Sequence, residues 1–122
     1  MYQKLTETEE EIMQQIWRLK ECTVRELMEA MDAEDKPHST VSSVVRILEK
    51  KGFVDHKAYG RTHVYYPTVV REGYVQQNLE EMEAEYFSGS TRELVSFLVK
   101  KEKLKPKDLE EMMTLINKTS KS

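Results

Sequence analysis

The residues best suited to chemistry lie between positions 36 and 61, where cations, hydroxyls and histidines are concentrated. This segment holds six Lys and Arg against two acids, a net charge of +4, whereas the whole chain carries −3. Segments 1–35 and 62–122 carry −6 and −1. A basic stretch in an acidic chain is expected where one face meets nucleic-acid phosphates. The sequence therefore predicts a double-stranded DNA partner.

The centre of this basic segment has the pattern of an amphipathic helix over about 39–51. Its apolar stripe falls at helical spacing, on Val41, Val44, Val45 and Leu48. The opposite side collects short hydroxyls and cations: Ser39, Ser42, Ser43, Arg46 and Lys50. Short hydroxyl side chains allow a helix to approach base edges, and Arg is suited to a base or a phosphate. The alternative is an ordinary solvated helix face.

A predicted β-hairpin follows this helix, with strands over 53–59 and 62–66 around Gly60. It places Arg61 at the tip, flanked by Lys57 and His63, where a wing would meet the DNA backbone or a minor groove. A surface turn is the alternative. The complete set of predicted DNA contacts is Ser39, Thr40, Ser42, Ser43, Arg46, Lys50, Lys51, Lys57 and Arg61.

Catalysis and metal binding have little support in the sequence. The three histidines include His56 and His63, which could face each other across the hairpin and supply two ligands at most. A catalytic zinc site usually has three protein ligands. The chain has one cysteine, Cys22, and no glycine-rich phosphate loop or nucleophile elbow. We expect no enzyme activity, no metal ion and no cofactor.

Three helices and the hairpin must position the basic residues. Thr6 with Glu9, and Thr23 with Glu26, have capping-box spacing and predict two helix starts before the basic segment. Gly52 is placed to end the third helix. Three short helices followed by a hairpin with a basic tip predict a winged helix-turn-helix domain over residues 1–68.

Beyond Pro67 the pattern becomes helical, which makes the chain mainly α and predicts a dimerisation region over residues 69–122. Val75, Leu79, Met82 and Tyr86 step by four, three and four, a heptad-like seam. Intramolecular core is the alternative for this seam. The predicted dimerisation residues are Val75, Leu79, Met82, Tyr86, Leu94, Phe97, Leu98, Leu109, Met112 and Ile116.

The composition favours a homodimer in the cytoplasm. Hydrophobic residues make up 39% and charged residues 34% of 122, so a lone monomer would have a thin core. No apolar run approaches the roughly 18–20 residues of a membrane span, and the N-terminus has no apolar signal region. We expect no membrane insertion.

Several segments resemble the penicillinase-repressor family, the repressors of β-lactamase and methicillin-resistance operons. LTETEEEIMQQIW, with Trp17, is similar to the opening helix of that family, and STVSSVVRILEKKGFV to its recognition helix. AYGRTHVYYP resembles the wing, and ELVSFLVKKEKL with PKDLEEMMTLI the dimerisation helices. The likeness covers nearly the whole chain.

The resemblance implies a homodimeric repressor on an inverted-repeat operator, released when a membrane sensor-protease triggers its proteolysis. Family cleavage commonly falls between an Asn and a Phe, and the matching pair here is Ser96–Phe97, which lacks the Asn. Ser39 and Ser42 stand where well-known members carry Lys and Arg, so a different operator sequence is expected. The C-terminal cysteine cluster of a copper-sensing branch is absent from the sequence.

Two other functions remain open at this point. The helical half could sense a small molecule directly, or the winged helix could bind a protein in place of DNA. A proteolysed repressor would leave a fragment, whereas a ligand-sensing regulator would stay intact.

Overall fold

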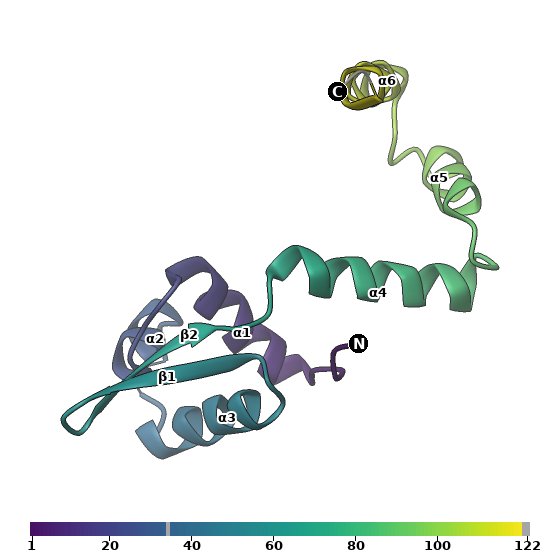
Figure 1. Ribbon diagram of the computed structural model, residues 1–122. Coiled ribbons are helices and arrows are strands. Elements are labelled where there is room, and N and C mark those ends of the chain that lie inside the picture. Colours follow the sequence, from purple (N-terminus) through teal and green to yellow (C-terminus); the bar gives the residue numbers. More distant parts are fainter. Residues whose placement is uncertain (34, 121–122) are drawn as a thin grey trace. The chain divides into compact units, whose positions relative to one another are not determined.

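The computed structural model describes residues 1–33 and 35–120 and contains helices and one small sheet (Figure 1). The elements are α1 (Glu7–Leu19), α2 (Val24–Ala30), α3 (His38–Lys50), β1 (Val54–Tyr59), β2 (Thr62–Pro67), α4 (Arg71–Tyr86), α5 (Thr91–Lys100) and α6 (Pro106–Ser120). No helix within the described ranges is long and apolar enough to cross a membrane.

Both predicted capping boxes are present. At α1 the Thr6 hydroxyl accepts from the Glu9 N–H, and the Glu9 carboxylate accepts from the Thr6 N–H. Thr23 and Glu26 repeat this exchange at α2. Each box satisfies two backbone donors that would otherwise lack partners, which sets where the two helices begin.

The third helix begins one residue earlier than predicted, at His38, after the N-cap residue Pro37. It ends at Lys50, and Gly52 follows with φ +81°. Glycine adopts this left-handed conformation without the Cβ clash of other residues, so the chain can turn sharply into β1.

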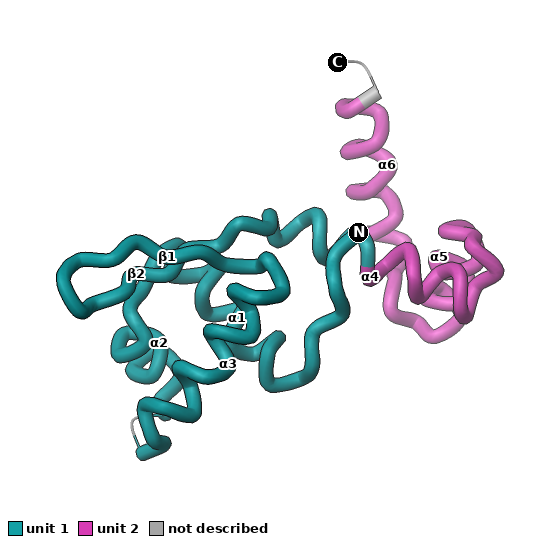
Figure 2. The backbone as a smooth tube through the Cα atoms, turned by 60° about the horizontal axis from the view of Figure 1, so that its bottom comes forward, with its two compact units in different colours: residues 1–77 teal, residues 78–122 magenta. Residues whose placement is uncertain are grey.

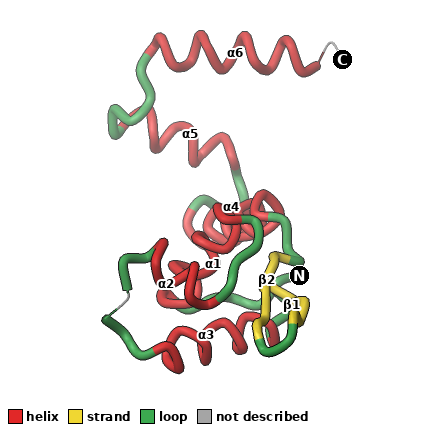
Figure 3. The backbone as a smooth tube through the Cα atoms, turned by 90° about the vertical axis from the view of Figure 1, so that its left-hand side faces the viewer, coloured by secondary structure: helices red, strands yellow, loops and turns green. Residues whose placement is uncertain are grey.

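The two strands pair antiparallel, from Val54 opposite Pro67 to Tyr59 opposite Thr62. Gly60, with φ +62°, lies in the turn between them. Cys22, in the α1–α2 connection, adds an isolated bridge to Tyr65, and each N–H donates to the carbonyl of the other residue. Three helices with this hairpin form the predicted winged helix-turn-helix (Figure 3).

The core of the winged helix lies where α1, α2, α3 and the start of the hairpin meet. All four contribute fully buried side chains, among them Met13, Ile16, Leu27, Val45, Leu48 and Phe53. Trp17 packs at the edge of this core and donates its indole N–H to the Val69 carbonyl over 2.8 Å. These contacts hold α3 and the hairpin on one scaffold.

The chain divides into two compact units, Met1–Gln77 and Asn78–Ser122 (Figure 2). This division comes nine residues after the domain boundary expected at residue 68. Tyr74 accounts for the difference: it is 4% exposed and contacts the rings of Phe53 and Trp17. Gln77 also exchanges two hydrogen bonds with the backbone of Tyr2. The first turns of α4 thus complete the core of the first unit.

Candidate nucleic-acid interface

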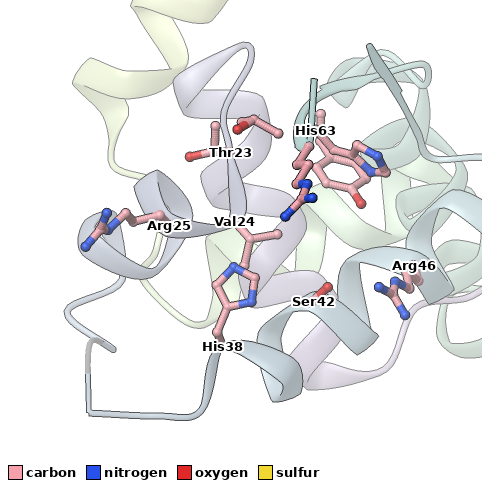
Figure 4. A pocket seen from close by; sticks show the side chains of 10 residues that line it. Thr23, Val24, Arg25, His38, Ser42, Arg46 and His63 are labelled. Carbon is pink, nitrogen blue, oxygen red and sulfur yellow. The ribbon is translucent and has the colours of Figure 1, made fainter. Parts of the chain in front are cut away.

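A cationic cleft of about 440 Å³ opens between α2, α3 and β2 (Figure 4). Three arginines line it, Arg25 from α2, Arg46 from α3 and Arg61 from the hairpin turn. None of the described residues along its walls is acidic; the others are Thr23, Val24, His38, Ser42, Thr62, His63 and Tyr65. Such a surface can hold an anion through Coulomb attraction and charge-assisted hydrogen bonds.

Tyr65 forms part of the cleft wall and is 4% exposed. Burial raises the pKa of its hydroxyl, and the carboxylate of Glu49 adds to this increase, while Arg46 opposes it. The phenol is therefore neutral near pH 7 and can donate a hydrogen bond.

Ser42 differs from the sequence expectation. The helical pattern placed it on the exposed side with Arg46, whereas only 9% of the residue is exposed. It lines the cleft together with Val24 of α2 and Tyr65 of β2. A short hydroxyl here leaves the cleft open.

Lys51, which the sequence predicted as a DNA contact, instead pairs with an acidic side chain of the same unit. Its ammonium group lies 2.6 Å from Glu9 Oε1 and 3.3 Å from the carbonyl oxygen of Lys4. Burial tends to raise the pKa of Glu9, but hydrogen bonds from Lys51 and Thr6, with the charge of Lys51, hold it below 4.5. Lys51 is therefore a positioning residue for the start of α1, and its charge is already neutralised.

The remaining predicted contacts lie on exposed surface of the same unit. Ser39, Thr40, Ser43 and Lys50 are exposed on α3, and the Ser43 hydroxyl donates to the Ser39 carbonyl. At 100° per residue, Ser39, Ser43 and Lys50 lie within 60° of Arg46, whereas Thr40 lies 120° away. Lys57 is exposed on β1, with its ammonium group 5.6 Å from the ring centroid of Tyr66.

Sequence reasoning did not include Arg25, His38 and Thr23 in the interface. Arg25 belongs to segment 1–35, which has a net charge of −6, so the charge distribution along the chain did not indicate it as a DNA contact. The capping box at Thr23 was the available signal, since it places Arg25 in the first turn of α2. Only the packing of α2 against α3 brings this arginine to Arg46 and Arg61.

The second unit presents much apolar surface in the single chain. Of the predicted dimerisation residues, Leu79, Met82, Tyr86, Phe97, Met112 and Ile116 are exposed by 38–71%, and Leu94, Leu98 and Leu109 are half-buried. Val75, also exposed, belongs to the first unit. In α5, Phe97 contacts the ring of Phe87 and Ser96 is exposed.

Comparison with known proteins agrees with this architecture. The family model of the penicillinase repressor matches residues 5–118. The methicillin resistance regulatory protein MecI of Staphylococcus aureus (strain N315) is 26% identical over 116 residues, covering 94% of each chain. The penicillinase repressor of Bacillus licheniformis is 19% identical over 114 residues, covering 93% of this chain and 89% of its own.

A solved structure shares the fold of the first unit. The DNA-binding domain of the repressor BlaI, determined in solution, is 25% identical and superposes with a TM-score of 0.52. It covers 61% of this chain, and this chain covers 94% of it. With the family model matching nearly the whole sequence, the chain belongs to the penicillinase repressor family.

Proposed function

We propose that this chain is a DNA-binding transcriptional repressor that acts as a homodimer on an inverted-repeat operator. The observation that carries the proposal is the cleft between α2, α3 and the hairpin, lined by Arg25, Arg46 and Arg61. Such a cluster, with no acid among the described lining residues, favours a polyanion. Family membership and the likeness to a DNA-binding domain support the same partner.

In this proposal α3 enters the major groove and the hairpin contacts the backbone beside it. The short side chains of Ser39 and Ser43 allow close approach, and Arg46 reads a base or binds a phosphate. Arg61 and Lys57 attract phosphates from the hairpin, as Lys50 does from α3.

Dimerisation supplies the affinity that a single winged helix lacks. Two linked copies bind two half-sites about one helical turn (~34 Å) apart, and the second contact becomes intramolecular. The exposed apolar residues of α4, α5 and α6, including Leu79, Met112 and Ile116, favour a second copy as the partner of this surface.

Release from the operator is proposed to follow proteolysis triggered by a membrane sensor-protease. The Ser96–Phe97 bond lies in α5, between the winged helix and α6, and both residues are exposed. Cutting there would remove α6 from the dimerisation region. An induced cell extract that contains only the intact chain would contradict this route and favour direct ligand sensing.

The decisive experiment selects bound sequences from random double-stranded DNA with the purified full chain. The expected result is enrichment of an inverted repeat. Arg46→Ala is expected to cost about 1–3 kcal/mol on the selected site, and less on random DNA if the arginine reads a base. Arg18→Ala, an exposed change on α1, is the control. No retention of any duplex at low ionic strength would refute the proposal.

A further inference from the structure

A second group of polar side chains joins the end of α3 to the start of the hairpin. Glu49 of α3 and the neighbouring residues Asp55 and His56 of β1 each offer one ligand atom, and these atoms lie within 4.8 Å of one another. Nδ1 of His56 and Oε2 of Glu49 share a hydrogen bond of 2.6 Å. This set lies outside the arginine-lined cleft, and neither the predicted DNA contacts nor the dimer surface includes it.

The local fold holds these three residues together. Gly52 turns the chain at the end of α3, the Phe53 N–H donates to the Leu48 carbonyl, and Phe53 is fully buried. The strand β1 therefore starts beside the last turn of α3, which brings Asp55 and His56 to Glu49.

Two aromatic rings of β2 also pack against the His56 ring. His63 stacks on it with 4.2 Å between ring centroids and 14° between planes, and the buried Tyr65 ring lies 5.5 Å away. The side chains of His56 and Glu49 are 30% and 28% exposed, so both are partly ordered by packing and still open to solution.

Although the sequence predicted no metal ion, we propose that Glu49, Asp55 and His56 form a binding site for a divalent transition-metal ion of the zinc type. One imidazole nitrogen and two carboxylate oxygens are ligands that Zn²⁺ accepts, and a site at the surface leaves room for water as a further ligand. Mg²⁺ favours oxygen ligands in an octahedron and is a poorer match for the imidazole.

Metal binding would couple to the DNA surface through charge, and this step rests on the proposed function. Glu49 and Asp55 are the only acids in residues 36–61, and they lie close in sequence to the cations Lys50 and Lys57. A dication held between them raises the net charge of that segment from +4 to +6. The ion therefore acts as a co-repressor that also ties the hairpin to α3.

The site is tested first without DNA. Metal-free full-length protein is titrated with ZnCl₂ in a calorimeter, and one ion per chain is expected. Glu49→Gln and His56→Ala are each expected to weaken Zn²⁺ binding at least tenfold, because changing a residue that only supports a metal ligand already costs ~10–100-fold. His38→Ala removes a histidine outside the set and is expected to leave binding unchanged. Failure of wild type to bind Zn²⁺, or equal binding by all three variants, would overturn the site.

The regulatory effect is then measured as binding of a labelled random duplex in Zn²⁺ and in EDTA. Two added charges about 10 Å from a phosphate in water correspond to roughly fourfold tighter binding. Glu49→Gln is expected to lose this response, and Mg²⁺ at the same concentration is expected not to produce it. Equal affinity in Zn²⁺ and EDTA, or an equal effect of Mg²⁺, overturns the co-repressor role. Since the titration contains no DNA, failure of DNA binding leaves the result for the metal site intact.

Discussion

At the scale of single residues, Arg61 lies where the sequence predicted it, at the turn of the hairpin. It follows Gly60 at the hairpin turn and lines the cleft. We expect Arg61→Ala to weaken binding to all DNA sequences and to reduce the slope of log K against log salt by about one unit, because one phosphate contact is lost. Fluorescence anisotropy over a salt series measures this. Arg71→Ala, an exposed arginine outside the cleft, is the control, and an unchanged slope in Arg61→Ala would remove the wing from the interface.

Cys22 supplies a test of the core that does not depend on DNA. It is 2% exposed, and burial, with a smaller contribution from Glu26, raises the pKa of its thiol to about 11. At pH 8 about one thiol in a thousand is then ionised, and the sulfur is shielded as well. We expect reaction with a disulfide reagent to be at least roughly 100-fold slower in native protein than in guanidinium chloride. Similar rates in both solutions would mean that Cys22 is accessible in the folded chain.

The Glu9–Lys51 pair makes the stability of the first unit depend on pH. Because the folded state holds the pKa of Glu9 below 4.5, the folded chain binds fewer protons there than the unfolded chain. This contribution is present above pH 4.5 and is lost as the pH falls below it. We expect Lys51→Met to lower the free energy of unfolding by about 2 kcal/mol at pH 7 and to make it fall less steeply in acid. Urea unfolding at pH 7 and pH 3.5 measures both effects, and Lys50→Met is the neighbouring control.

At the scale of elements, the start of α1 depends on its capping box. The Thr6 hydroxyl accepts from the Glu9 N–H over 3.2 Å, and Glu9 in turn pairs with Lys51 from the end of α3. We expect Thr6→Ala to lower the free energy of unfolding by about 1 kcal/mol. Thr40→Ala, in the exposed first turn of α3, is expected to change it by less than about 0.5 kcal/mol. Equal losses in the two variants would contradict the capping role.

The positions of α3 and the hairpin along the sequence could be predicted, because the patterns that indicate them involve only neighbouring residues. Val41, Val45 and Leu48 repeat at helical spacing, and Gly52 and Gly60 mark two turns that require positive φ. The bridge between Cys22 and Tyr65 had no such signal, since it joins segments 43 residues apart through backbone atoms alone.

At the scale of the whole molecule, the second unit exposes large apolar side chains on α4, α5 and α6 of the single chain. Leu79 is 40% exposed and lies in the second unit. We expect Leu79→Glu to convert the proposed dimer to a monomer, because pairing would bury an unpaired charge, and to weaken operator binding by at least tenfold. Sedimentation and anisotropy measure the two effects. Val70→Glu, an equally drastic change at an exposed position of the first unit, is the control, and a dimeric Leu79→Glu with full affinity would show that the seam is misassigned.

Local patterns in the sequence were sufficient for the helix starts at Thr6 and Thr23, for the amphipathic α3 and for the hairpin with Arg61 near its turn, because capping, periodicity and turn chemistry act over a few neighbouring residues. Tertiary packing alone decided that Arg25 joins the cleft, that Ser42 is buried and that Lys51 pairs with Glu9. It also decided that Glu49 meets His56. Each of these contacts depends on how close two separate elements come in the folded chain. No local or periodic pattern in the sequence predicts which side chains meet across such a contact.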